Sequence, residues 1–308
     1  MLWFWLIVFV VALITLIKAS DFFNIAAEDI GLGYKISPFT IGLILLSIGT
    51  SLPELLSSIV AVWSDASEVV VGNVIGSNIA NIFLVLGLSA LIFKTPIVFD
   101  FKKIKLDMIF LIISTVFLLL SVLFYVFMWW EGLIGLFLFA IYMYLLKRAS
   151  SGPRKVSDHK TKKKSFIIFP LSIVLLYVGA RYTIDALIVI SEILSIGREA
   201  IAAGAIAFAT SLPELFVSLD AFKKGKHEMA AGNIIGSCIF NTFIVMGIPS
   251  LIGSLYVPAV AVNIYLPVMI LAIAFLFFVS YKAIPINRWW GGAIFLLYMI
   301  FIVLIFAY

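Results

Sequence analysis

Hydrophobic positions dominate the chain in long runs, and short polar connections separate these runs. Most runs reach or exceed the roughly 18 to 20 residues that an α-helix needs to cross a bilayer. The pattern predicts ten membrane-spanning helices, over residues 2–31, 38–63, 69–92, 106–127, 131–147, 166–195, 198–222, 228–252, 260–281 and 288–307. We therefore predict an all-α integral membrane protein, because the strands of a transmembrane barrel would alternate in polarity.

One clearly polar segment divides the ten predicted helices into two sets of five. This segment, residues 147–165, carries eight Lys and Arg residues and a single acidic one, Asp158. We predict a first five-helix unit over residues 1–147, a basic cytoplasmic linker over 148–165 and a second five-helix unit over 166–308. Binding of nucleic acid by this linker is not expected, since charged loops of membrane proteins are normally solvated and face anionic lipid.

The two halves contain the same motifs, offset by 160 positions. Gly-Thr-Ser-Leu-Pro-Glu-Leu at 49–55 returns as Ala-Thr-Ser-Leu-Pro-Glu-Leu at 209–215, and the segment 72–81 returns at 232–241. An odd number of helices in each half makes the halves enter the membrane from opposite sides. The sequence thus predicts two inverted-topology repeats, an architecture of secondary transporters whose substrate site lies near the bilayer midplane.

Glu54 and Glu214 are the charged residues of the repeated motif, and each lies about halfway along a predicted membrane helix. A charge at that depth costs at least about 2.5–3.5 kcal/mol, so such residues are usually functional. A structural ion pair with an intramembrane base is the alternative. Lys18 and Arg181 are the candidate bases, and neither is duplicated in the other half.

The residues around the glutamates are also suited to binding cations. Thr50 and Ser51 lie four and three positions before Glu54, on the same helical face. Pro53 and Pro213 lack a backbone N–H and so free the carbonyls of residues 49 and 209. Within a membrane such carbonyls need a partner, and a bound cation can be one.

The second repeated motif adds further oxygen atoms. Ser77 and Asn81, with their copies Ser237 and Asn241, are expected to be ligands, whereas Asn73 and Asn233 are equally suited to hydrogen bonding between helices. Cys238 replaces Asn78 in the second copy and is expected to pack. Carboxylate, hydroxyl, amide and carbonyl oxygens suit Ca²⁺ and Na⁺. The two carboxylates repel each other, so we expect protons to compete for them.

The amino-acid composition limits the kinds of metal site and crosslink that are expected. The chain of 308 residues is 64% hydrophobic and 12% charged, with mean hydropathy +1.22. It has one cysteine, and His159 and His227 lie beside lysines in polar loops, so no disulfide and no zinc or copper site are expected. The apolar stretch 1–17 lacks a preceding basic region and is predicted to be a retained first helix rather than a signal peptide.

Basic residues also predict the orientation. The net charge is +5, and all but three of the 21 Lys and Arg residues fall in loops after odd-numbered helices or in the linker; the three are Lys18, Arg181 and Arg198. The positive-inside rule places these loops in the cytoplasm and both termini outside. We expect a multi-pass protein of the plasma membrane of a prokaryote.

These motifs resemble the α-repeats of the cation/calcium exchanger superfamily, most closely the sodium/calcium exchangers and their prokaryotic relatives. The resemblance covers nearly the whole chain, and it implies a central Ca²⁺ site. Its residues would be Thr50, Glu54, Thr210 and Glu214. It further implies Na⁺ ligation by Ser51, Ser77, Ser211 and Ser237, with backbone oxygens near Ser47 and Ala207, and sliding of the first and sixth helices. Two departures stand out: Asn81 and Asn241 are both Asn where family members often carry one Asp, and Ala209 replaces Gly.

We therefore hypothesise an antiporter that exchanges Ca²⁺ for Na⁺ through one shared midplane site, working as a monomer in the lipid bilayer and without a cofactor. A proton/calcium or other divalent-cation antiporter on the same scaffold is the nearest alternative. A channel is disfavoured by the inverted repeat. The sequence contains no Ser/His or Cys/His pair in its membrane segments and no Gly-Lys-Ser/Thr phosphate loop, so neither an enzyme nor an ATP-driven pump is expected.

Overall fold

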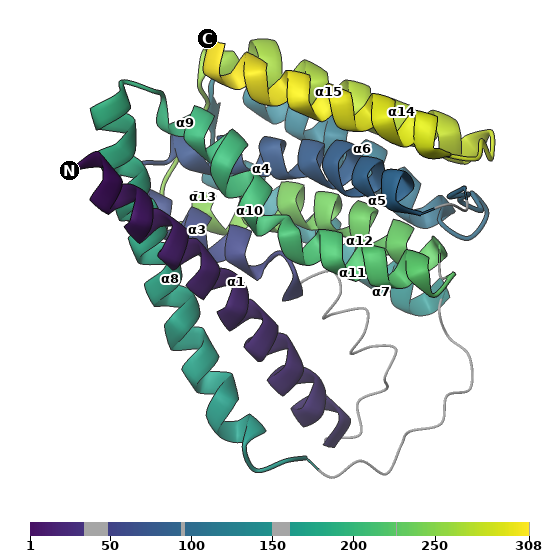
Figure 1. Cartoon of the computed structure of the whole chain (residues 1–308), viewed down its shortest axis with the longest axis horizontal. Helices are drawn as coiled ribbons and strands as arrows, with labels where there is room; N and C mark the ends of the chain where they lie inside the picture. The colour runs from purple at the N-terminus through teal and green to yellow at the C-terminus, as the bar shows by residue number, and fades with distance from the viewer. Residues whose placement is uncertain (34–48, 94–95, 150–160, 226, 308) are drawn as a thin grey trace.

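The computed structural model describes residues 1–33, 49–93, 96–149, 161–225 and 227–307, and nearly all of them are helical (Figure 1). The first half contains α1 Leu2–Gly33, α3 Leu52–Trp63, α4 Glu68–Ile79, the π-helical segment η2 Ala80–Leu86, α5 Gly87–Ile92, α6 Lys105–Val122, strand β1 Val126–Phe127 and α7 Trp129–Ala149. The second half contains α8 Ser165–Leu194, α9 Arg198–Ile201, η3 Ala202–Ile206, α10 Ala207–Thr210, α11 Leu212–Lys223, α12 His227–Phe240, η4 Asn241–Val245, α13 Gly247–Ser250, strand β2 Leu255–Tyr256, η5 Ala261–Tyr265, α14 Leu266–Tyr281 and α15 Arg288–Ala307.

The predicted fold class is confirmed. Within the described ranges, nine helices or helical runs are long and apolar enough to cross a membrane, and they coincide with nine of the ten predicted spans. The remaining predicted span, 38–63, is represented by the shorter α3, and its residues 38–48 lie outside the described part of the chain.

One predicted boundary is wrong. The fourth helix was expected to continue to residue 127, but α6 ends at Val122. Tyr125 adopts a left-handed backbone with φ of 60°, which an α-helix does not tolerate. The chain then forms β1, whose Val126 pairs with Tyr256 of β2 in an antiparallel register. Apolar composition alone did not distinguish this turn from a further helical turn.

Matching contacts at the two ends of the bundle support the inverted repeat. Before α6, Ile97 exchanges backbone hydrogen bonds of 2.9 and 2.8 Å with Ile286. After α6, at its opposite end, β1 pairs with β2. A shift of 160 positions carries Ile97 to Val257, directly after β2, and carries Ile286 to Val126 of β1. The same pairing between halves therefore occurs once at each end, as inverted repeats require.

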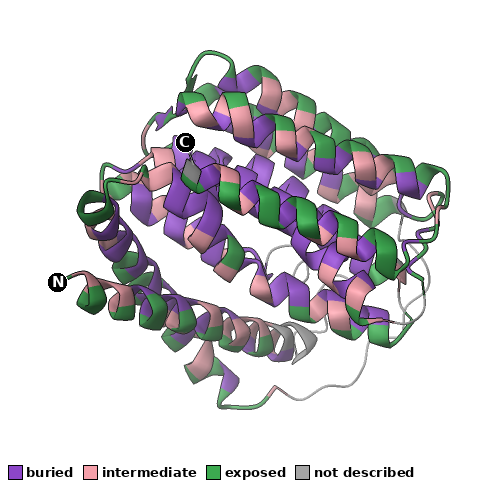
Figure 2. Cartoon of the chain, turned by 45° about the horizontal axis from the view of Figure 1, so that its top comes forward, coloured by how far each residue is buried: buried purple, intermediate pink, exposed green. Residues whose placement is uncertain are grey.

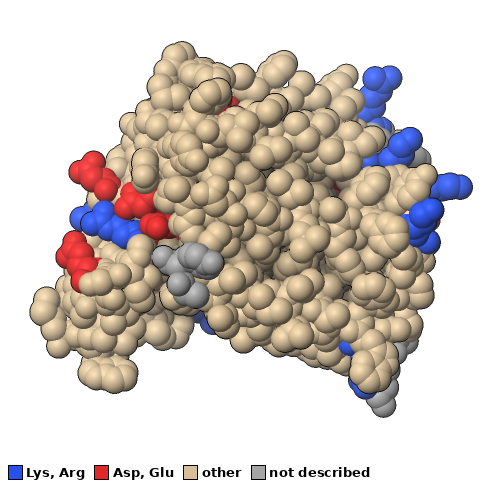
Figure 3. All heavy atoms as spheres, turned by 90° about the horizontal axis from the view of Figure 1, so that it is seen from above, with Lys and Arg blue, Asp and Glu red and all other residues tan. Residues whose placement is uncertain are grey.

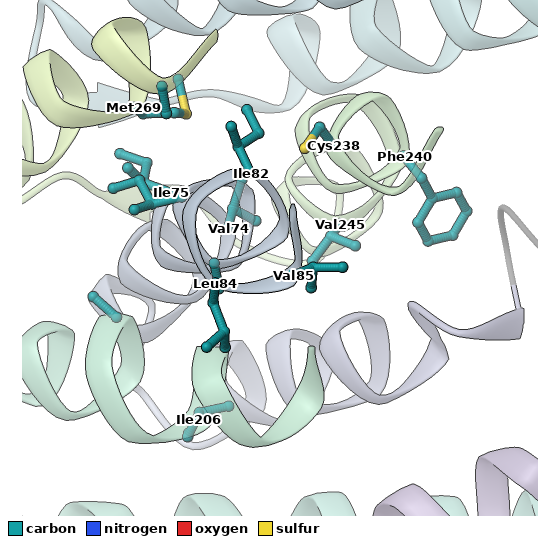
Figure 4. Close-up of a cluster of buried hydrophobic side chains, with 14 of the residues drawn as sticks. Val74, Ile75, Ile82, Leu84, Val85, Ile206, Cys238, Phe240, Val245 and Met269 are labelled. Carbon is teal, nitrogen blue, oxygen red and sulfur yellow. The ribbon is translucent and has the colours of Figure 1, made fainter. Parts of the chain in front are cut away.

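The helices with the repeated motifs form the centre of the molecule. The span Glu68–Ile92 is fully buried in its most apolar window and Met229–Ser250 is 89% buried, whereas α15 is only 28% buried in its window. Figure 2 shows this arrangement, with buried residues inside and exposed ones on the outer helices. Figure 4 shows part of the core, in which Val74 and Ile82 of the first half lie near Cys238 and Val245 of the second. Exposed apolar side chains on the outer helices are suited to contact with lipid.

α1 and α8 form a pair that lies side by side along one flank of the bundle (Figure 1). Gly179 permits their close approach, because a Cβ atom there would lie 2.9 Å from the backbone nitrogen of Leu16. Near the end of α1, Asp29 Oδ2 accepts hydrogen bonds from the Lys162 backbone N–H at 2.8 Å and from Ser165 Oγ at 2.7 Å. The two long helices are thus joined both along their length and at the start of α8.

Candidate functional site

Each motif proline lies in the first turn of a short helix and is followed directly by a glutamate. Pro53 and Pro213 occupy the first turns of α3 and α11, and in the second half Ser211 separates α11 from the preceding α10. Glu54 and Glu214 then lie in the first turn of their short helices and are completely buried. The N-terminus of a helix carries partial positive charge, which favours a carboxylate there. The sequence thus positions two buried carboxylates at the starts of two short helices.

Hydroxyl groups of the motifs lie against the two glutamates, three of them across the interface of the halves. Ser51 Oγ donates to Glu214 Oε1 at 3.0 Å, and Ser237 Oγ is 3.4 Å from the same oxygen. The Thr50 side chain also approaches the Glu214 carboxylate, and the Thr210 side chain approaches that of Glu54. The structure therefore brings both carboxylates and four of the predicted hydroxyl ligands together at the interface of the repeats.

Several oxygen atoms of this site are buried without a hydrogen-bond partner among the described residues: Glu54 Oε1 and Oε2, Glu214 Oε2, Asn81 Oδ1, Asn241 Oδ1 and Ser211 Oγ. Buried polar atoms of folded proteins are nearly always paired, so a cluster of unpaired oxygens calls for an explanation. Bound cations are one kind of partner that such oxygens can have. Among the described residues, no group of three or more His, Cys, Asp and Glu side chains is placed to hold a metal ion.

For two other predicted ligands, Ser77 and Ala207, the structure gives contacts to groups other than the carboxylates. Ser77 Oγ lies 3.5 Å from Asn73 Oδ1, and the Ala207 carbonyl accepts the backbone N–H of Ser211 at 3.1 Å. Ser47 lies outside the described residues. The remaining predicted ligands are buried, as the site requires.

The freed carbonyl of Gly49 has a partner that the sequence analysis missed. Ser20 Oγ of α1 donates to this carbonyl at 2.7 Å. Asn24, one turn further along α1, lies so close that a Cβ atom on residue 49 would overlap its amide. The corresponding positions in the second half are Ala180 and Ile184, so no repeated pattern points to these two residues.

Asn73 and Asn233 make the same pair of contacts in the two halves. Asn233 Nδ2 donates to the Glu214 carbonyl at 3.1 Å and to Ser218 Oγ at 3.0 Å. Asn73 Nδ2 lies 3.4 Å from each of the corresponding atoms, the Glu54 carbonyl and the hydroxyl of the residue four positions later. Each amide thus joins the glutamate-bearing helix to the helix that follows it, which supports the interhelical interpretation.

The two intramembrane bases do not neutralise the glutamates. Lys18 pairs with Asp21 at 3.4 Å, and Arg181 pairs with Asp185 at 3.1 Å. Both pairs are partly exposed and join residues on one helix. In the described part of the chain, no ion pair includes Glu54 or Glu214. The alternative of a structural ion pair at the motif is therefore not supported.

Known proteins resemble this chain along its whole length. Residues 4–147 and 164–307 match the family described as sodium/calcium exchanger protein. The sodium/calcium exchanger MaX1 of Methanosarcina acetivorans is 31% identical, over 97% of this chain and 98% of that protein. An uncharacterized membrane protein of Methanocaldococcus jannaschii is 35% identical over 95% of both chains.

A solved structure agrees with these matches. The sodium-calcium exchanger NCX_Mj, soaked with 100 mM Na⁺ and 10 mM Sr²⁺, superposes with a TM-score of 0.68 at 33% identity, over 98% of this chain and 99% of that one. The family resemblance inferred from the motifs is confirmed, and the relatives are transporters rather than enzymes. The chain belongs to the sodium/calcium exchanger family.

Proposed function

We propose that this protein is a secondary antiporter that exchanges Ca²⁺ for Na⁺ through one site shared by both ions. Its relatives MaX1 and NCX_Mj are named as exchangers of these ions, and its own interior offers a matching set of oxygen atoms. One observation carries the proposal: Glu54 and Glu214 are completely buried at the interface of the repeats, and three of their four carboxylate oxygens lack a partner among the described residues.

Charge explains why the two ions exclude each other. Two carboxylates balance the charge of one Ca²⁺, with Thr50 and Thr210 beside them as further ligands. Na⁺ would use the same carboxylates together with the hydroxyls of Ser51, Ser77, Ser211 and Ser237, and Asn81 and Asn241 would add amide oxygens. Since both ions need the glutamates, one must leave before the other binds. This competition is the proposed source of coupling.

Alternating access is assigned to the paired helices α1 and α8. Ions shift a conformational equilibrium only through different affinities for its states. The site with bound ions is neutral, whereas bare carboxylates resist passing through the apolar interior. Asp29 joins α1 to the start of α8, and Ser20 joins α1 to the backbone beside Thr50, so a shift of this pair would change the site directly.

The proposed orientation follows the positive-inside rule. Figure 3 shows most of the visible Lys and Arg at one edge of the molecule, while the visible Asp and Glu lie mainly at the opposite edge together with a smaller basic group. We assign the basic edge and the linker 148–165 to the cytoplasm, both termini to the outside, and the units 1–147 and 166–308 to the two repeats. We further propose that the monomer is the working unit in the plasma membrane of a prokaryote.

Uptake of ⁴⁵Ca²⁺ into proteoliposomes tests this proposal. One set of vesicles is loaded with Na⁺, and a second is free of Na⁺ but carries an imposed pH gradient. The proposal predicts saturable uptake with internal Na⁺ and none in Na⁺-free vesicles. Uptake driven by the pH gradient alone would refute sodium coupling and establish a proton/calcium antiporter, whereas non-saturating flux without a counter-ion would indicate a channel.

A further inference from the structure

A chain of buried amide contacts leads from α14 to the candidate cation site. Asn78 of α4 donates from Nδ2 to Thr242 Oγ1 at 3.2 Å and lies 3.7 Å from Met269 Sδ of α14. Asn241 of η4 donates from its own Nδ2 to Asn78 Oδ1 at 3.3 Å. All four residues are at least 99% buried. None of the Asn78, Thr242 and Met269 side chains belongs to the predicted ligand set.

The chemistry of the hydrogen-bond partners determines how the two amides, Asn78 and Asn241, are oriented. A thioether sulfur accepts hydrogen bonds but cannot donate them, so the group of Asn78 that faces Met269 must be the NH₂. The oxygen of Asn78 is then on the side of Asn241. That oxygen also only accepts, and therefore the NH₂ of Asn241 must face it. The remaining atom, Asn241 Oδ1, is buried and has no partner among the described residues.

We propose that Asn78 is a positioning residue that holds the Asn241 amide with its oxygen available to the transported cation. The inference rests on the proposed function, since it concerns the same site. An amide has one oxygen and one NH₂ of nearly equal size, and only the oxygen binds a cation. Without Asn78 the amide is free to rotate, and the NH₂ group would then occupy the ligand position for part of the time.

The first half lacks this arrangement, which offers an internal comparison. Cys238 takes the position of Asn78 in the second motif, and its Sγ lies 3.8 Å from the Asn78 carbonyl. Both polar atoms of the equivalent amide, Asn81, lack a hydrogen-bond partner among the described residues. Figure 4 shows Met269 and Cys238 on different helices around the one that carries Val74. The two amides therefore have different neighbours: Asn78 faces Asn241 in one repeat, and the Cys238 side chain lies beside Asn81 in the other.

A double-mutant cycle tests the proposal. Asn78→Leu removes the acceptor, and Asn241→Asp replaces the amide by a carboxylate, whose two oxygens make rotation irrelevant. We expect Asn78→Leu to weaken Ca²⁺ binding about tenfold in the wild-type background. In the Asn241→Asp background the same change should alter the Ca²⁺ affinity less than about twofold. Asn78 acts on the cation only through the orientation of the Asn241 amide, and that amide is absent in this background. Met269→Leu should follow the same pattern with a smaller loss.

Calorimetry of the purified protein in detergent measures these affinities without any ion gradient. An equal loss from Asn78→Leu in both backgrounds would overturn the proposal and make Asn78 a structural residue. Loss of Ca²⁺ binding in Asn241→Asp alone would overturn it as well, since an oxygen at residue 241 is what the proposal requires. Wild-type protein that binds Ca²⁺ but shows no Na⁺-dependent uptake would instead refute sodium coupling and leave the amide argument standing.

Discussion

Replacing Asn233 by Leu separates a structural role of the repeated Asn from a role as ligand. The change keeps the side-chain volume and removes an NH₂ group that donates to the Glu214 carbonyl at 3.1 Å and to Ser218 Oγ at 3.0 Å. We expect the variant to be less stable but still able to bind Ca²⁺, because Asn233 holds the glutamate-bearing helix rather than the ion.

The magnitude follows from the two lost hydrogen bonds. Each contributes about 1 kcal/mol in soluble proteins and about 0.6 kcal/mol in a membrane protein. Asn233 Oδ1 has no partner among the described residues, so its removal offsets part of the loss. The net decrease is about 1 kcal/mol, which lowers the melting temperature of a chain of this size by about 1–2 °C.

Thermal unfolding in detergent, followed by tryptophan fluorescence, measures this change, and calorimetry measures Ca²⁺ affinity in the same samples. Asn73→Leu is the corresponding variant in the first half: its two hydrogen bonds are longer, at 3.4 Å, but it also removes the contact of Asn73 Oδ1 with Ser77 Oγ, so we expect a decrease of similar size. Adding Ser218→Ala to Asn233→Leu should produce little further loss, since the two side chains share one contact. An unchanged melting temperature with Ca²⁺ affinity reduced tenfold would refute the structural role.

Three further changes test other parts of the structure. Ser20→Ala removes the 2.7 Å hydrogen bond to the Gly49 carbonyl. A loss of about 1 kcal/mol should change the exchange rate about fivefold at unchanged Ca²⁺ affinity. ⁴⁵Ca²⁺ uptake measures this rate, and an unchanged rate would contradict the proposed link between α1 and the site. Gly76→Ala would place a Cβ atom 2.4 Å from the Ala203 carbonyl oxygen, so it should destabilise the protein by about 1–3 kcal/mol in thermal melts, and wild-type stability would contradict this packing. Removal of Ca²⁺ with a chelator should lower the stability by about 2.7 kcal/mol relative to Ca²⁺ at 100 times its Kd, and equal melting curves would argue against a Ca²⁺ site.

Most of the fold was predictable because a membrane helix must be long, apolar and internally hydrogen bonded. The repeat then indicated a candidate site, since the same carboxylate, proline and hydroxyls occur twice at one spacing. The end of α6 was missed because residues 123–127 continue the hydrophobic run of the helix, and their turn depends on pairing with β2.

The contributions of unrepeated residues were also missed. Ser20 and Met269 act through contacts between helices that are far apart in sequence, and neither has a counterpart of the same type in the other half. The spacing of residues along the sequence shows which of them share one face of a helix. It does not show which other helix packs against that face. The carbonyl of Gly49 illustrates this limit: the proline predicts that it is free, and only the placement of α1 supplies its partner.

The central claim is that two buried glutamates carry the exchange. Glu131 provides a matched control, because it is also buried and accepts the Met128 backbone N–H at 2.6 Å, a bond that Gln retains. The most direct measurement is Na⁺-driven ⁴⁵Ca²⁺ uptake by Glu54→Gln, Glu214→Gln and Glu131→Gln, each reconstituted as folded protein. The account predicts no uptake by the first two variants and uptake close to wild type by the third. Normal uptake by either Glu54→Gln or Glu214→Gln would contradict it.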